Sequence, residues 1–449
     1  MMSADDLTIR FFLAAAVILI ACKLVSLLVG RVGQPPVVGE MISGVLLGPS
    51  LLGEISPRLE ADLFPKALLP IIYVAGQLGL AALMFQAGRE LRGYLRPGLG
   101  RTAATISGLG VTVPLVAGIG LAYAFEGHVA ITVPGVSGDV TAAFVGVTLA
   151  ITAFPMLARI IIERGLSGTR FGSLALACGG IDDMAAWLML AGVLSLASGK
   201  AWPITKALAG AVIFAAVLIF VVRPLLSRYL RGTRLTPQTV LLVTVVLVLG
   251  AAWFTTDIGL YAVFGAFSIG LVMPPEPNAR PSVGTASSLG TAPPVSTVPR
   301  QDLVTPTMGG ISAILVPMFF TYSGLNTRFA LLTNPRVLWF SVAAIAVAIV
   351  AKGGACWLGA RLAGERGSVA GRIGTLMNAR GLMQLIALNV GLQAGIASQD
   401  LFTSLVLVAL VTTIMTAPVL SWMDRRGPGP GPGPALPAEP PAGLPEAVG

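Results

Sequence analysis

The chain has 449 residues, of which 55% are hydrophobic and only 11% are charged. A soluble protein could not bury this much apolar surface, so the composition predicts an all-α, polytopic membrane protein. The formal net charge of +9 would suggest nucleic-acid binding in a soluble protein, but here the arginines stand in short connections between apolar segments. That placement is the positive-inside pattern, so we expect a lipid bilayer and no nucleic acid as partner.

Apolar segments predict about thirteen membrane spans. They cover residues 8–30, 36–53, 65–87, 102–125, 138–162, 171–197, 203–226, 237–255, 258–274, 308–326, 335–361, 372–394 and 400–423. Arginine-rich loops alternate with acidic, arginine-poor loops such as the one with Glu54, Glu60 and Asp62. The arginine-rich loops are expected in the cytoplasm, which places the N-terminus outside and the C-terminus inside a cell (inner) membrane.

Two segments between or after the spans have a different composition. Residues 275–307 are rich in Pro, Ser, Thr and Ala, which predicts a flexible cytoplasmic linker. Residues 424–449 contain a Gly-Pro repeat from Gly427 onward and predict a disordered tail. We expect neither segment to carry the chemistry of the protein.

Two adjacent carboxylates, Asp182 and Asp183, stand in the middle of the span at 171–197. An ionisable group at this depth costs at least a few kcal/mol unless it is paired or faces water. Neighbouring helical residues point about 100° apart, so one carboxylate can face a protein partner while the other faces a cavity. Buried charge is a poor source of stability, so we favour ion handling over a purely structural role.

A lysine within the span at 335–361 can supply the counter-charge. Lys352 lies deep in apolar sequence and is followed by two glycines that allow close helix approach. Pairing with Asp182 or Asp183 is the interpretation we favour. The alternative is a lysine that extends along the helix to the membrane surface.

Two spans are interrupted at corresponding places. The fifth span contains Thr152 and Pro155, and the twelfth contains Asn378, Arg380 and Gly381. The two spans run in opposite directions because they lie seven spans apart, and broken helices in inverted halves point to the binding site of a transporter. The alternative is a single proline kink together with a misplaced span boundary.

Four stretches carry a resemblance to a known family. They are GQPPVVGE at 33–40, GVLLGPSLLG at 44–53, TAFPMLAR at 152–159, and the Asp pair followed by Ala186 and Trp187. In combination they resemble the monovalent cation:proton antiporter-2 family over about residues 8–423. The resemblance implies a secondary antiporter that exchanges a monovalent cation for protons by alternating access, with a core domain of inverted repeats, two crossed discontinuous helices and a dimerisation domain.

The resemblance also implies a division of the chain and a homodimer. The expected parts are 1–100 as dimerisation or scaffold spans, 101–200 as the first core repeat, 201–274 as connecting spans, 308–334 as a scaffold span and 335–423 as the second core repeat.

Roles for individual residues follow from the same resemblance. Asp183 is expected to bind the cation and the proton, Asp182 to pair with Lys352, and Thr152 to be a ligand of the ion near Asp183. Two Asp with a Lys is the combination associated with electrogenic Na⁺/H⁺ exchange. The stretch from Asn378 to Gly381 is closer to the plant and potassium-type branch, so Na⁺ is the first expectation and K⁺ the second.

The same residues also have to be compared with other functions that use buried carboxylates. An intramembrane aspartyl protease needs two carboxylates from separate helices on one water, whereas adjacent residues diverge, so we expect no catalytic residue and no enzyme. A potassium/proton exchanger or efflux channel of the same family stays open as an alternative. A sodium:organic-anion symporter is a weaker alternative, because it would not require two buried acids and a lysine. No cofactor is expected.

Overall fold

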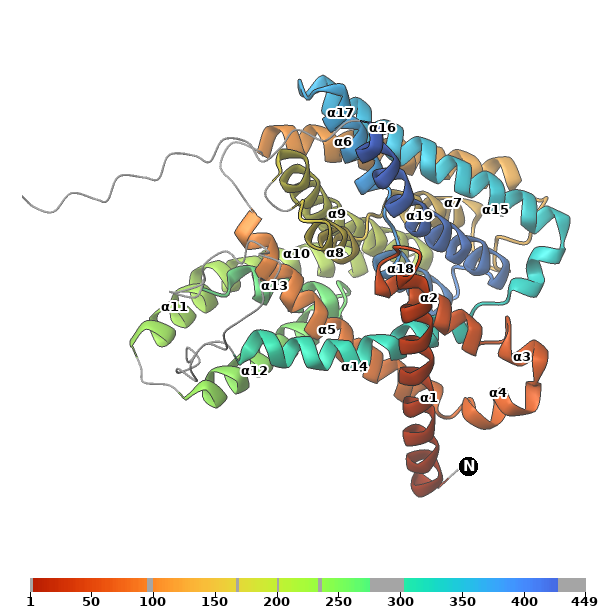
Figure 1. Ribbon diagram of the computed structural model, residues 1–449, viewed down its shortest axis with the longest axis horizontal. Helices are drawn as coiled ribbons and strands as arrows, with labels where there is room; N and C mark the ends of the chain where they lie inside the picture. Colours follow the sequence, from red (N-terminus) through yellow and green to blue (C-terminus); the bar gives the residue numbers. More distant parts are fainter. Residues whose placement is uncertain are drawn as a thin grey trace, which may run out of the picture.

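The computed structural model describes residues 3–94, 100–166, 169–199, 202–232, 236–274 and 303–426. All regular structure in these ranges is helical (Figure 1). Most of the predicted linker, residues 275–302, and the tail from residue 427 lie outside the described ranges. Helix α14 already begins at Val304 and α19 continues to Arg426, so the described residues at the margins of both segments are helical.

The helices follow the predicted spans. Those without interruption are α1 (Ala4–Gly30), α2 (Pro36–Leu47), α5 (Leu69–Tyr94), α6 (Gly100–Phe125), α9 (Arg170–Ser198), α12 (Pro237–Asp257), α13 (Ala262–Val272), α14 (Val304–Leu325) and α19 (Gln399–Arg426). Two helices contain a π-helical turn: α10 (Trp202–Val217), η1 (Leu218–Val222) and α11 (Arg223–Gly232) form the first, and α15 (Pro335–Val347), η3 (Ala348–Gly353) and α16 (Gly354–Leu362) the second. The connections hold the short α3 (Leu52–Ile55), α4 (Pro57–Leu63) and η2 (Phe329–Thr333).

Ten helical segments of the described chain are long and apolar enough to cross a membrane. The shorter α13 and two broken helices correspond to the remaining predicted spans. The broken helices are α7 (Gly138–Ala150) with α8 (Phe154–Glu163), and α17 (Gly367–Met377) with α18 (Leu382–Gln393). The chain is thus an all-α, polytopic membrane protein, and thirteen crossings stay a prediction.

The two breaks meet each other. After α7 the chain becomes extended at Ile151, and the backbone N–H of Ala153 donates to the carbonyl of Ala379 in the other break at 3.2 Å. Gly381 adopts φ +132°, a conformation that L side chains rarely adopt, which allows the chain to turn into α18. The two interruptions expected from the sequence therefore form one crossing point.

Pro155 has a different place from the one expected. The sequence placed Pro155 in the interruption of the fifth span, but it is the second residue of α8 and follows the break. A proline in the first turn of a helix costs little, because the N–H that it lacks would have no partner there. The sequence therefore marks the start of the second half-helix rather than the break itself.

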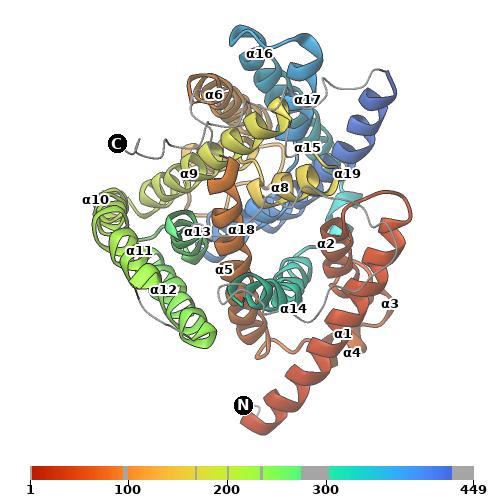
Figure 2. The same cartoon turned by 60° about the vertical axis from the view of Figure 1, so that its left-hand side comes forward.

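Helices from both halves of the chain surround this crossing. Helix α6 packs against α7 and α16, α9 against α17, and α18 against α7 and α8. In a second group, α5 packs between α13 and α14, and α14 also packs against α2. Figure 2 shows α8 and α18 at the centre of the molecule, between these two groups. The assignment of the groups to core and dimerisation domains stays a prediction.

Glycines set the distance between α2 and α14. A Cβ on Gly44 would lie 2.2 Å from the carbonyl oxygen of Phe320, and a Cβ on Gly324 would lie 2.0 Å from the carbonyl oxygen of Gly44. Small residues at such contacts let membrane helices approach at backbone distance, which increases their van der Waals contact.

This contact predicts that Gly324→Ala destabilises the protein, because the methyl group would overlap backbone atoms that cannot move alone. Overpacking of this kind commonly costs about 1–3 kcal/mol. Gly310→Ala is the control, since a Cβ at Gly310 of the same helix meets no atom within 4 Å. Melting temperatures of both variants in detergent test the prediction, and equal values would mean that α2 and α14 do not touch at Gly324.

Candidate functional site

Helix α9 carries both carboxylates into the protein interior. Thr169 caps its first turn by accepting a hydrogen bond from the N–H of Gly172, and Gly199 ends the helix with φ +64°. Asp182 and Asp183 stand near the middle of this helix and are both buried. One turn before them, the hydroxyl of Ser107 on α6 donates to the carbonyl of Cys178 at 3.2 Å, which fixes α6 against α9.

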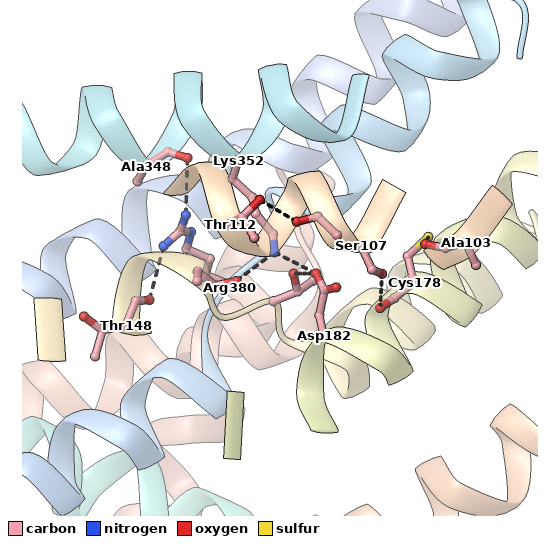
Figure 3. Close-up of polar contacts among 12 residues, drawn as sticks. Ala103, Ser107, Thr112, Thr148, Cys178, Asp182, Ala348, Lys352 and Arg380 are labelled. Atoms are coloured by element: carbon pink, nitrogen blue, oxygen red, sulfur yellow. Dashed lines mark hydrogen bonds and ion pairs between the residues drawn. The ribbon is translucent and has the colours of Figure 1, made fainter. Parts of the chain in front are cut away.

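Asp182 forms a buried ion pair with Lys352 (Figure 3). The Nζ of Lys352 lies 2.7 Å from Oδ2 of Asp182 and donates to the carbonyl of Ala150 at the same distance. Neither side chain of the pair is accessible to solvent. The lysine therefore contacts both a carboxylate and the carbonyl end of α7, and it does not extend to the membrane surface.

Thr152 lies in the break between α7 and α8 and contacts the first carboxylate. Its hydroxyl donates to Oδ2 of Asp182 at 2.9 Å, the same oxygen that accepts from Lys352. The hydrogen bond of Thr152 thus goes to Asp182, the residue before Asp183, and its role as a ligand of the ion stays a prediction. The hydroxyl oxygen of Thr152 keeps lone pairs that can still coordinate a cation.

Asp183 has no comparable partner. Among the described residues, neither of its carboxylate oxygens has a hydrogen-bond partner, although the side chain is buried. The amide of Phe154, the first residue of α8, faces this carboxylate without hydrogen-bond geometry. The N-terminus of a helix carries partial positive charge, which favours an anion there. A buried carboxylate with free oxygens can accept either a proton or a dehydrated cation.

Arg380 occupies the second break and is fully buried. Its guanidinium donates to the carbonyl of Thr148 near the end of α7 at 3.4 Å and to that of Ala348 at 3.2 Å. Its own carbonyl accepts from the hydroxyl of Thr413 on α19 at 2.7 Å. The side chain thus links the two broken helices and the helix that carries Lys352.

The structure brings together most of the residues that the sequence singled out, and it adds others. Asp182, Lys352 and Thr152 share contacts, and Arg380 donates to the same helix end as Lys352. Sequence reasoning missed the carbonyls of Thr148 and Ala150 as acceptors, because every residue has a carbonyl. It also missed the π-helical turn under Lys352, for which the sequence offers no signal beyond the glycines that follow.

This arrangement defines a class of protein. Two broken helices that cross beside ionisable side chains are the architecture of a secondary transporter with its site near the bilayer midplane. Solved structures support the fold: the sodium proton antiporter MjNhaP1 from Methanocaldococcus jannaschii is similar with a TM-score of 0.56 at 13% identity, over 93% of this chain and 97% of that chain.

Sequence comparison then gives the family. Residues 14–423 match the family model of the transmembrane sodium/hydrogen exchangers, and the chain belongs to that family. It is 35% identical to the Na(+)/H(+) antiporter NhaS4 of Synechocystis over 93% of this chain and 98% of that protein. It is 30% identical to the K(+)/H(+) antiporter 1 of Saccharomyces cerevisiae over 97% of this chain, and spans only 49% of the yeast protein.

The buried ion pair predicts non-additive effects of its two members on stability. Removing one partner leaves an unpaired buried charge, which commonly costs about 3–5 kcal/mol. Asp182→Asn and Lys352→Ala should each lower the melting temperature in detergent, and the double variant should recover part of the loss.

The exposed pair of Lys206 and Asp257, at 3.0 Å, provides the control. Asp257→Asn should change the stability by about 1 kcal/mol or less, because solvent screens such pairs. If the effects of Asp182→Asn and Lys352→Ala simply add, the two side chains are not energetically coupled.

Proposed function

We propose that this chain is a secondary antiporter that exchanges a monovalent cation for protons by alternating access. The observation that carries the proposal is the pair of adjacent carboxylates at the crossing of two broken helices: Asp182 is held by Lys352 and Thr152, and Asp183 has free oxygens. Membership of the sodium/hydrogen exchanger family supports the same function.

Na⁺ is the cation we propose first, and K⁺ is the alternative. One relative that this chain covers almost end to end is named as a Na⁺/H⁺ antiporter, and a relative with a longer chain is named as a K⁺/H⁺ antiporter. Both cations prefer hard oxygen ligands such as carboxylates, hydroxyls and backbone carbonyls. Asp183 and Thr152, together with carbonyls at the break after α7, are the donors that we assign to the ion.

Exchange follows from competition for one carboxylate. A proton and a dehydrated cation both neutralise Asp183, and repulsion disfavours their presence together in a low-dielectric site. Binding of one therefore releases the other. If the site faces only one side of the membrane at a time, the protein must carry a cation in one direction and protons in the other.

We propose a cell (inner) membrane location, with the N-terminus outside and the C-terminus in the cytoplasm. The arginine-rich loops support this orientation. We also propose a homodimer through the N-terminal helix. Helix α1 exposes large apolar side chains, including Ile9 (68% exposed) and Phe12 (67%), which face either lipid or a second copy of the chain.

Asp183→Asn should abolish cation-dependent proton flux and leave a folded protein, because it keeps the shape of the side chain and removes its titratable charge. Purified protein in liposomes with a pH-sensitive dye measures the flux after addition of Na⁺, K⁺ or Li⁺ separately. Asp139→Asn is the control, since Asp139 is exposed and accepts a hydrogen bond from Tyr123. Flux of wild-type size in Asp183→Asn would place the site elsewhere, and wild-type protein inactive with all three cations would refute exchange.

The proposed orientation predicts where terminal reporters are active. A fluorescent protein that folds only in the cytoplasm should be bright when fused to the C-terminus, and alkaline phosphatase, which needs the oxidising exterior, should be active at the N-terminus. The reverse pattern would invert every loop and contradict the positive-inside assignment.

A further inference from the structure

Lys352 stands on a π-helical turn, η3 (Ala348–Gly353), in the middle of a long membrane helix. A π-helical turn holds one residue more than an α-helical turn, so residues after it are rotated by about 100° from the direction that an uninterrupted helix would give. The direction of the Lys352 side chain toward Asp182 therefore depends on this turn. Such turns are uncommon, and neighbouring groups are needed to hold them.

Two side chains of the second break hold the turn. The Nδ2 of Asn378 donates to the carbonyl of Ile349 at 3.4 Å, and the guanidinium of Arg380 donates to the carbonyl of Ala348 at 3.2 Å. Both side chains are buried, and the bilayer core offers no water that could compete for these carbonyls. Figure 3 shows Arg380 between Ala348 and Thr148, beside Lys352.

Glycines allow the second break to come this close. A Cβ on Gly374 of α17 would lie 2.6 Å from the carbonyl oxygen of Gly353, the last residue of the turn. The backbones of α17 and η3 therefore touch, which brings Asn378 within reach of Ile349. Arg380 also donates to Thr148, two residues before the carbonyl that accepts from Lys352.

We propose that Asn378 and Arg380 are positioning residues for Lys352. They hold the carbonyls of the π-helical turn and keep the ammonium group directed at Asp182 and at the end of α7. Neither side chain donates to a carboxylate in the described structure; they act through the backbone of η3. The effect on transport rests on the proposed antiport function, but the effect on the ion pair does not.

The first test is a double-mutant cycle on melting temperature, which does not depend on transport. Asn378→Leu removes the donor at similar size, and its effect is measured with Lys352 present and in a Lys352→Ala background. We expect a smaller loss of melting temperature without Lys352, because part of the contribution of Asn378 comes through the ion pair.

Asn389 offers a matched control. It is as buried as Asn378, but its amide donates to Ser323 on α14 and to Leu385, away from η3. Asn389→Leu should lower the melting temperature by the same amount with or without Lys352. Equal coupling of both asparagines to Lys352 would overturn the proposal.

The second test is the pH profile of cation-dependent proton flux in liposomes. A carboxylate that loses a nearby ammonium keeps its proton at higher pH. We therefore expect Asn378→Leu to shift the profile upward by roughly half a pH unit or more, and Asn389→Leu to leave the midpoint unchanged. A profile of Asn378→Leu that coincides with that of the wild type would contradict a positioning role.

Arg380→Lys keeps the proposal testable if Asn378→Leu does not fold. It retains the positive charge, but a single ammonium cannot reproduce the guanidinium fork that spans the carbonyls of Thr148 and Ala348. For Arg380→Lys we expect the same results: a smaller loss of melting temperature in the Lys352→Ala background and an upward shift of the pH profile. If the wild type exchanges none of the cations, the antiport proposal fails, and the melting-temperature cycle still decides whether Asn378 and Arg380 position Lys352.

Discussion

The constraint on which the site depends is the open carbonyl end of α7 inside the membrane. A helix that stops there leaves its last carbonyls without N–H donors, and the bilayer core offers no water to replace them. The structure satisfies two of them with cations: Lys352 donates to Ala150 and Arg380 to Thr148. Because a helix C-terminus carries partial negative charge, both cations are favourably placed. Both come from the second half of the chain, Lys352 from η3 and Arg380 from the second break, so the end of α7 depends on both elements.

Two identical side chains acquire different roles from this geometry. Asp182 points toward the cations and receives hydrogen bonds from Lys352 and Thr152 on a single oxygen. Asp183 is the next residue, so the helix turns it about 100° away from those donors. Among the described residues its oxygens have no hydrogen-bond partner, which is why we propose Asp183 as the ligand of the transported ion and Asp182 as the partner of a permanent charge. Thr152 connects the two, because its hydroxyl can donate to Asp182 and still offer lone pairs to a cation.

Much of this could be predicted from the sequence, because charged and polar residues stand out in apolar spans. Asp182, Asp183 and Lys352 were visible for that reason, and so were the interruptions near Thr152 and Asn378. The other features of the site could not be predicted from the sequence, because they depend on the conformation of the backbone. Carbonyl acceptors have no residue type, a π-helical turn has no strict sequence pattern, and a proline marks the first turn of a half-helix as readily as a kink.

The charges of the site explain why the break, the ion pair and the exchange belong together. With Lys352 and Arg380 both protonated, the site is neutral when both aspartates are ionised. This neutral state has one carboxylate, Asp183, with no bonded partner, so it attracts a proton or a cation. Either ligand raises the net charge of a dry site by one, and a second ligand would raise it again at a much higher electrostatic cost. A site with only one cation would be negative before binding and neutral with one ligand, so a second ligand would meet less repulsion there. With Arg380 buried at the crossing as a second cation, we expect the first ligand to make the site positive already and so to disfavour the second.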